Sequence, residues 1–512
     1  MKKQSLIKGS LILGIAGILA RFLGLFFRWP LIMLIGDEGV GYYQMSYPLY
    51  MFFIEIASGL PVAMSKMISE RNALNDIDGS FQVVKESAYL MITIGIGTTF
   101  ALFFFAKPII SFLKWDSKAY YSLIGISFAP FIISFTTIFR GFFQGFQNMT
   151  PSAISQILEQ IGRVIFGVGL AIILLPKGIE YSAGGAAFGA TAGAVLGGSY
   201  LFSQYKKTKK NFKIKKIKTN TEVLSSILKI AVPISLGTTV GSIMNLIDSI
   251  LVPQKLLQAG LNNTQATILY AQLTGKAAVI TNIPLTLSMA ICTSLIPIIA
   301  ENFILNKKAE LKNKIDAAMK MAAVIALPCM FGLFFLSGPI LNLIFPGRSE
   351  GSEILKYLSI SIPFIIVTQT TTSILQGTGH YIKPVINLFI GCIVKIILTS
   401  MLVSITEFNI YGAVIASIGA YVTASILNII TLRICIKVTM NFYEILIKPC
   451  FAAIIMMIVV LLSYNSIYKN IGSNGLSCLI SIFLGMIMYI ILILAFKVFE
   501  VNEIKNRFNR KR

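Results

Sequence analysis

Long apolar stretches separated by short polar connections run through the whole chain. Most of them have about twenty residues or more, the length that an α-helix needs to cross the hydrocarbon core of a bilayer. The short alternating segments typical of a membrane β-barrel are not visible in the sequence. The pattern therefore predicts an all-α polytopic membrane protein with about fourteen transmembrane helices. These spans are expected at residues 6–35, 42–66, 86–106, 120–142, 152–175, 182–204, 224–252, 266–300, 316–340, 354–375, 384–405, 410–436, 446–465 and 475–498.

The composition agrees with a membrane protein and excludes a soluble one. Of the 512 residues, 55% are hydrophobic and 13% are charged, and the mean hydropathy is +0.79. The formal net charge is +23, and basic residues cluster at the N-terminus, in loops 205–220 and 301–314, and in the C-terminal tail. With fourteen spans, all of these clusters fall on one side of the membrane, which the positive-inside rule identifies as the cytoplasm. We therefore expect both termini to be cytoplasmic and no nucleic-acid partner. The clusters are interpreted as topology signals that also attract anionic membrane lipids, with a specific partner site as the alternative.

The lysine-rich connection divides six spans from eight, and the two parts are weakly alike. Gln144 precedes Arg163 by 19 residues in the first part, and Gln376 precedes Lys395 by 19 residues in the second. Two repeats of six spans indicate two lobes of the kind found in transporters that alternate access. The expected division is an N-terminal lobe at 1–204, a basic linker at 205–223, a C-terminal lobe at 224–436, two accessory spans within 437–498 and a basic tail at 499–512.

Ionisable residues inside the apolar stretches are the strongest functional signal. Arg21 and Arg28 lie seven residues apart in the first stretch, so two helical turns place them on one face. A charge in the middle of a bilayer costs several kcal/mol, by an amount that is disputed. We therefore expect the two arginines to line a watery cavity that receives an anion. A guanidinium group suits phosphate because it donates two parallel hydrogen bonds.

Six further charged residues within the expected spans are candidates for functional or structural roles. The candidate cavity residues are Glu55, Lys276 and Lys395, beside Arg21 and Arg28, and the candidate structural or gating charges are Glu159, Arg163 and Asp248. Glu159 and Arg163 are four residues apart on one helix face, which favours a structural ion pair. Asp248 and Lys276 have the alternative of extending to water near a helix end. The set holds five basic and three acidic residues, a balance opposite to the one a drug-cation exporter would need.

The remaining residue types exclude several kinds of site. His380 is the only histidine, which rules out a multi-histidine metal site. The six cysteines lie within or at the ends of apolar stretches without a Cys-x-x-Cys pair, so we interpret them as small hydrophobic residues. The sequence has no P-loop. We expect no metal, no cofactor and no enzymatic activity.

Several motifs resemble one known family. The N-terminal ones are LIKGSLIL (Leu6–Leu13), RFLGLFFR (Arg21–Arg28), IGDEGVGYY (Ile35–Tyr43) and GLPVAMSK (Gly59–Lys66), and the later ones are QGFQNMTP (Gln144–Pro151), SQILEQIGR (Ser155–Arg163) and QLTG (Gln272–Gly275). Together they resemble the SpoVB and MurJ-like branch of the multidrug/oligosaccharidyl-lipid/polysaccharide exporter superfamily. The resemblance covers spans one to about eleven and is most specific in the first half.

The resemblance implies a flippase in the plasma membrane of a bacterium. Such proteins move undecaprenyl-linked cell-wall precursors such as lipid II from the inner to the outer leaflet, for spore cortex or general wall synthesis. Their two six-helix lobes form a V around a cationic cavity, and two extra C-terminal helices form a groove for the lipid tail. Arg21 and Arg28 match the family's two first-helix arginines, whose expected role is to hold the diphosphate. Cell-wall synthesis proteins are candidate partners.

The chain also departs from this family. Glu55 is the nearest candidate for an expected second-span arginine, and Lys276 is a loose counterpart of one in span eight. Asp248 resembles a sodium-site acid, but Lys395 stands where its partner acid is expected. Coupling to membrane potential, H⁺ or Na⁺ therefore stays open. The alternatives are a flippase for another lipid-linked polysaccharide, a drug/cation antiporter, a membrane glycosyltransferase with carboxylates in an outer loop, and a scaffold of wall synthesis.

Overall fold

The computed structural model describes residue 4 and residues 6–212, 221–436, 441 and 443–498, and within these it is helical without a β-strand. By contacts, the chain forms two compact units, Met1–Ala271 and Gln272–Arg512. The helices of the first unit are α1 (Leu6–Ile56), α2 (Gly59–Ala73), α3 (Ile77–Phe104), α4 (Ala106–Leu113), α5 (Ala119–Ser127), α6 (Ala129–Gly145), α7 (Thr150–Leu174), the 3₁₀-helix η1 (Leu175–Lys177), α8 (Ile179–Lys209), α9 (Thr221–Gln258) and α10 (Asn263–Ala271).

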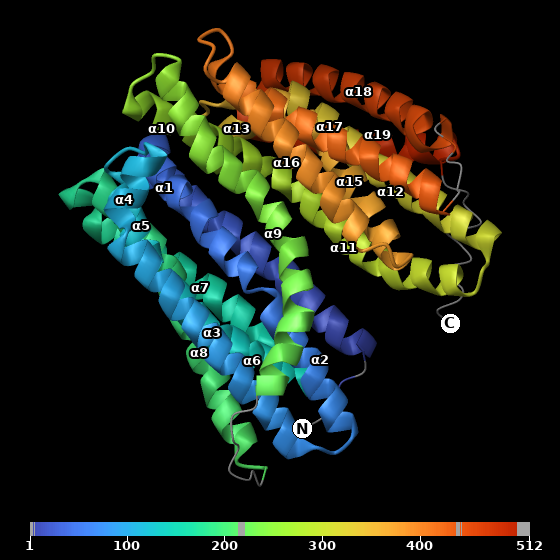
Figure 1. Cartoon of the computed structure of the whole chain (residues 1–512). Coiled ribbons are helices and arrows are strands. Elements are labelled where there is room, and N and C mark those ends of the chain that lie inside the picture. The colour runs from blue at the N-terminus through green and yellow to red at the C-terminus, as the bar shows by residue number, and fades with distance from the viewer. Residues whose placement is uncertain (1–3, 5, 213–220, 437–440, 442, 499–512) are drawn as a thin grey trace. The chain divides into compact units, whose positions relative to one another are not determined.

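The second unit begins with a short π-helix and ends with a helical hairpin (Figure 1). Its helices are the π-helix η2 (Gln272–Ala277), α11 (Ala278–Ile304), α12 (Lys308–Phe335), α13 (Ser337–Ile344), α14 (Ser352–Ser359), α15 (Ser361–Gly377), α16 (Ile382–Leu402), α17 (Asn409–Ile436), the π-helix η3 (Tyr443–Ile447), α18 (Lys448–Ile471) and α19 (Asn474–Ala495).

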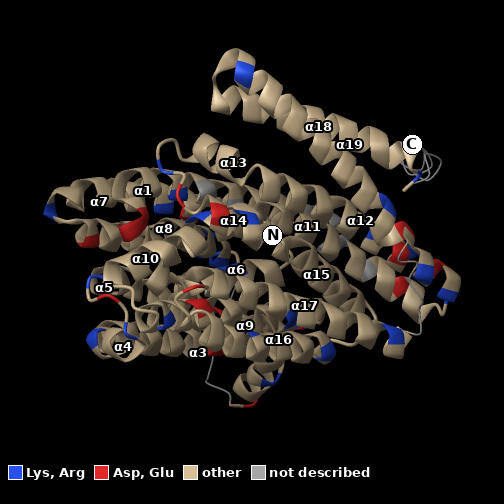
Figure 2. Ribbon diagram, turned by 90° about the horizontal axis from the view of Figure 1, so that it is seen from above, with Lys and Arg blue, Asp and Glu red and all other residues tan. Residues whose placement is uncertain are grey.

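The predicted all-α polytopic membrane protein is confirmed. Eleven segments of the described chain are long and apolar enough to cross a membrane, or up to twelve if the bent pair α14–α15 is one span. Figure 2 shows long uncharged stretches of ribbon, for example along α18 and α19. The count of eleven treats residues 12–73 as one segment. The number fourteen stays a prediction.

Helix α1 is broken at Gly36. Its 51 residues would extend about 77 Å if straight, well over twice the hydrocarbon thickness of about 30 Å. Gly36 has φ 64° and ψ −172°, a backbone conformation that is essentially restricted to glycine. The rings of Phe27 and Tyr43 nevertheless touch, with centroids 5.8 Å apart. Because a straight helix would separate these residues by about 24 Å, the two segments of α1 must bend sharply toward each other.

Small residues allow close packing within the first unit. On α8, Gly189, Gly193 and Gly197 face the backbone of α7, and a Cβ at Gly193 would overlap the carbonyl oxygen of Glu159. Helix α9 packs against α1 and α2, where a Cβ at Gly59 would overlap the carbonyl oxygen of Ala231. Contacts thus group α9 with the N-terminal helices, whereas the repeat pattern begins a C-terminal lobe at residue 224. The division into repeats stays a prediction.

The second unit has separate apolar clusters. One joins α12 to the α18–α19 hairpin through residues that include Leu327, Met456 and Tyr489. Another joins α11, α12 and α15 through residues that include Ile299, Ile315 and Ile374. The hairpin is therefore an integral part of this unit's packing.

Candidate anion-binding site

Arg28 carries the first cationic group of the site. It lies on the segment of α1 before the Gly36 break and is half-buried. Its Nη1 atom is fully buried and has no hydrogen-bond partner among the described residues. A buried guanidinium N–H without an acceptor is costly, especially in a membrane-spanning helix. Arg21 lies on the same segment, and its side chain is outside the described residues.

Three tyrosines follow the break at helical spacing. Tyr43, Tyr47 and Tyr50 occupy positions i, i+4 and i+7, so they share one face of the second segment of α1. Tyr43 and Tyr47 are stacked with ring centroids 5.5 Å apart, and Tyr47 and Tyr50 are 5.9 Å apart. The sequence interpretation did not single out these tyrosines, although their spacing was a usable signal.

Arg163 on α7 lies against this aromatic face. Its guanidinium carbon is 5.9 Å from the centre of the Tyr47 ring, within cation–π range. Its Nε atom is buried without a hydrogen bond to any described residue. Arg28 follows Phe27, whose ring centroid lies 5.8 Å from that of Tyr43, so the segment that carries Arg28 meets the same aromatic face as Arg163.

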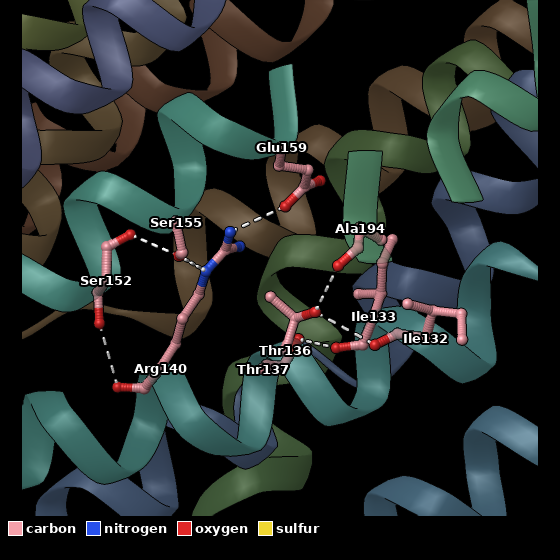
Figure 3. Close-up of polar contacts among 9 residues, drawn as sticks. All are labelled: Ile132, Ile133, Thr136, Thr137, Arg140, Ser152, Ser155, Glu159 and Ala194. Carbon is pink, nitrogen blue, oxygen red and sulfur yellow. Dashed lines mark hydrogen bonds and ion pairs between the residues drawn. The ribbon is translucent and has the colours of Figure 1, made fainter. Parts of the chain in front are cut away.

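Glu159 pairs with Arg140, as Figure 3 shows, and forms no ion pair with Arg163. Arg140 Nη2 donates to Glu159 Oε2 at 2.8 Å, and its Nε donates to Ser155 Oγ at 3.0 Å. The structural pair expected between Glu159 and Arg163 is therefore not the one formed. Arg140 comes from the end of α6, which is anchored by the fully buried Phe142, and so reaches the carboxylate from a different helix. Arg140 is not among the charges that the sequence pattern singled out.

Glu55 lies near the end of α1 and is half-buried. Its backbone carbonyl accepts a hydrogen bond from Ser58 Oγ at 2.7 Å. Its carboxylate forms no ion pair with a described residue. Asp248 is also in the first unit, buried on α9.

Lys276 is fully buried in the second unit, in the π-helix η2. Its ammonium group donates to the carbonyl oxygens of Arg348 at 2.8 Å and Glu350 at 3.3 Å, and lies 3.5 Å from the Glu350 carboxylate. It thus binds the connection between α13 and α14 instead of extending to water.

Lys395 is buried on α16 of the second unit. One end of the same helix carries a polar network, in which Asn387 Nδ2 donates to Asn428 Oδ1 at 2.9 Å. Asn428 Nδ2 lies 3.1 Å from the hydroxyl oxygens of both Thr371 and Thr372. Within the part of the chain that the structure describes, no group of three or more His, Cys, Asp or Glu side chains could hold a metal ion.

Comparisons with known proteins agree with the motifs. Residues 6–303 match the family described as polysaccharide biosynthesis protein, and residues 233–401 match the MatE family. Stage V sporulation protein B of Bacillus subtilis is 28% identical over 99% of this chain and 98% of its own length. The lipid II flippase MurJ of the same organism is 26% identical over 84% of this chain and 83% of its length.

Solved structures share the fold. A lipid II flippase MurJ in an inward closed conformation has a TM-score of 0.74 at 18% identity, covering 95% of this chain and 99% of that one. A multidrug resistance MATE family transporter in an inward-facing conformation has a TM-score of 0.69 at 17% identity, covering 81% and 94%. The relatives that are named for an activity are flippases and transporters, so the chain's relationships are with transport and not with catalysis. The chain belongs to the polysaccharide biosynthesis protein family, in the SpoVB and MurJ-like branch of the multidrug/oligosaccharidyl-lipid/polysaccharide exporter superfamily.

Proposed function

We propose that this membrane protein is a flippase that moves an undecaprenyl-diphosphate-linked peptidoglycan precursor, similar to lipid II, from the inner to the outer leaflet. The observation that carries the proposal is the buried Nη1 of Arg28 in a membrane-spanning helix, which has no hydrogen-bond partner in the part of the chain that the structure describes. The full-length similarity to stage V sporulation protein B and the similarity to a lipid II flippase support it.

The chemistry of the substrate explains why arginines serve this step. A diphosphate is highly charged and cannot cross hydrocarbon without partners for its charge. Arg28, with Arg21 on the same segment of α1, would hold the diphosphate through paired hydrogen bonds. The headgroup would pass between the leaflets by alternating access while the undecaprenyl tail stays in lipid.

The α18–α19 hairpin is suited to contact that tail. Large hydrophobic side chains on it are more than half exposed, including Leu462, Phe483 and Ile490. Such side chains face lipid in a membrane, and a polyprenyl chain is chemically similar to lipid tails. We place the protein in the plasma membrane of a bacterium, with both termini in the cytoplasm. We propose that the membrane potential or an ion gradient drives its transport cycle.

A drug/cation antiporter is the second candidate, because MATE transporters share the fold and residues 233–401 match the MatE family. The positive charges of Arg28 and Arg163 at the candidate site favour an anionic substrate over a cationic drug.

Leaflet exchange in liposomes tests the function. The purified full chain is reconstituted with headgroup-labelled lipid II under an imposed membrane potential, and an impermeant reagent then destroys the label in the outer leaflet. In liposomes without the protein, we expect the reagent to destroy only the label in the outer leaflet. In liposomes with the protein, we expect label from the inner leaflet to be lost as well. Labelled undecaprenyl-diphosphate oligosaccharide and a fluorescent cation are compared in parallel. Transport of the cation alone would contradict a flippase.

A further inference from the structure

Arg163 lacks the anionic partner that its sequence position predicts. Glu159 lies one turn earlier on α7, where a glutamate and an arginine ordinarily meet. In the structure, the Glu159 carboxylate binds Arg140 at 2.8 Å, and Arg163 forms no ion pair within the described residues. Arg163 therefore keeps its full positive charge inside the first unit.

The aromatic contact does not satisfy Arg163. The guanidinium carbon of Arg163 lies over the Tyr47 ring, 5.9 Å from the ring centre. A ring contacts the π-face of a guanidinium but accepts none of the in-plane N–H groups. The N–H groups of Arg163 have no hydrogen-bond acceptor among the described residues, and the buried Nε is one of them. They are available to the oxygen atoms of an anionic ligand such as a phosphate group.

Arg28 provides a second guanidinium near the same rings. Its buried Nη1 has no hydrogen-bond partner among the described residues, and the neighbouring Phe27 packs against Tyr43 on the same aromatic face. Like charges held close in a low-dielectric interior repel each other, and an anion between them removes that repulsion. A diphosphate can offer one phosphate to each guanidinium group.

We propose that Arg163 is a substrate-binding arginine that holds the diphosphate of the lipid-linked substrate together with Arg28, and that Arg140 is a positioning residue that keeps Glu159 from neutralising it. The proposal rests on the function proposed above, and it gives a substrate-binding role to Arg163, for which the sequence pattern predicts only a structural or gating role. Tyr47 contributes a cation–π contact to the Arg163 guanidinium.

The first experiment measures binding of farnesyl diphosphate to the purified full chain in detergent by titration calorimetry. We expect Arg163→Gln to weaken binding about tenfold to a hundredfold, because charge-assisted hydrogen bonds to a phosphate are lost. Arg163→Lys keeps the charge but loses the planar fork, so we expect an intermediate loss. Arg71→Gln, a matched change in a residue paired with Asp76 at the α2–α3 turn, should bind as the unchanged chain does. Equal binding by Arg163→Gln and the unchanged chain would overturn the proposal.

Two further probes identify the source of the anion. Inorganic pyrophosphate tests the diphosphate alone, and farnesol tests the apolar tail alone. An effect of Arg163→Gln on both diphosphates but not on farnesol supports a site for the phosphate groups. An equal effect on farnesol would mean that the substitution damages the fold or the tail contacts, and it would overturn the assignment.

A rescue experiment does not depend on altering Arg163. In Arg140→Gln, Glu159 loses its partner and becomes available to Arg163 on the same helix, so we expect weaker binding of farnesyl diphosphate. Adding Glu159→Gln removes the competing carboxylate and should restore binding. If Arg140 has only a structural role, the double variant will bind no better than Arg140→Gln, and that result contradicts the positioning role.

The outcomes separate this inference from the proposed function. If the unchanged chain fails to exchange lipid II between leaflets but binds farnesyl diphosphate through Arg163, the flippase assignment fails and the binding site stands. If the chain exchanges lipid II and Arg163→Gln does so equally well, the function stands and the role of Arg163 is rejected.

Discussion

At the scale of single residues, the most informative feature is charge that lacks a countercharge. Arg28 and Arg140 are both half-buried arginines of the first unit, but among the described residues only Arg140 of the two has a carboxylate partner. The burial of a paired arginine needs no ligand, because other residues of the protein accept its hydrogen bonds and balance its charge. Arg28 leaves an N–H group unmet, and this difference indicates a ligand.

Arg28→Ala should reduce lipid II exchange about tenfold or more, because the charge-assisted hydrogen bonds to the diphosphate are lost. The chain should still insert in the membrane, since the substitution makes its helix more apolar. The liposome assay measures exchange, and size-exclusion chromatography checks the fold. Arg71→Ala provides the control. Normal exchange by the Arg28 variant would exclude the phosphate-binding role.

Lys276 is a buried cation whose ammonium group donates hydrogen bonds to backbone carbonyl groups. Lys276→Met should lower the free energy of unfolding by about 1–3 kcal/mol, because the carbonyl groups of Arg348 and Glu350 lose a buried donor. Thermal unfolding of the full chain in detergent measures this loss. Lys356→Met removes a lysine paired with the exposed Glu353 and should have little effect. Equal stability of the two variants would show that the Lys276 contacts contribute little.

At the scale of helices, the position of the site depends on how closely α7 approaches α8. The glycines of α8 let its backbone meet that of α7 at the turns that carry Glu159 and Arg163. The close packing therefore holds one side of α7 and leaves the Arg163 side chain directed at Tyr47 of α1.

Gly193→Ala should destabilise the chain by about 1–3 kcal/mol, because the added methyl group overlaps the Glu159 carbonyl oxygen and must push the helices apart. Gly169→Ala, on α7 with nothing within 4 Å of the added carbon, is the matched control and should be neutral or slightly stabilising. Thermal unfolding compares the two. Loss of stability in the control alone would refute the packing account.

The helices were predictable from sequence, but the partners of their charges were not. Apolar length identifies a span because only a helix meets its own backbone hydrogen bonds in lipid. Arg28 was found because a charge in such a stretch is rare. Glu159 was paired with Arg163 because sequence spacing reveals neighbours on one helix only. Its actual partner, Arg140, lies on another helix, and only tertiary packing brings the two together.

At the scale of the whole molecule, the packing of α9 against the N-terminal helices could not be predicted from the sequence either. Sequence repeats suggest where a duplicated unit begins, but contacts depend on which faces fit. Ser235 on α9 accepts a hydrogen bond from the backbone N–H of Gly59 at 3.0 Å, which joins two helices that the repeat pattern assigned to different lobes. No pattern in either segment alone shows this match.

The orientation in the membrane gives a test at this scale. A single cysteine at Lys210, in a cysteine-free background, should react with an impermeant reagent only after cells are permeabilised, because the basic connection is expected in the cytoplasm. A cysteine at Asn263, in the next connection, should react in intact cells. Mass-shift labelling of the full chain measures both. The opposite pattern would reverse the predicted topology.

The break at Gly36 has a consequence for the geometry of the candidate site. Arg28 lies eight residues before this glycine and Tyr43 seven residues after it, and the contact of Phe27 with Tyr43 shows that the two segments meet. A small backbone rotation at this one position changes the spacing between cation and aromatic ring without altering either side chain. Substitutions within residues 34–38 are therefore expected to shift Arg28 relative to Tyr43 while both side chains stay unchanged.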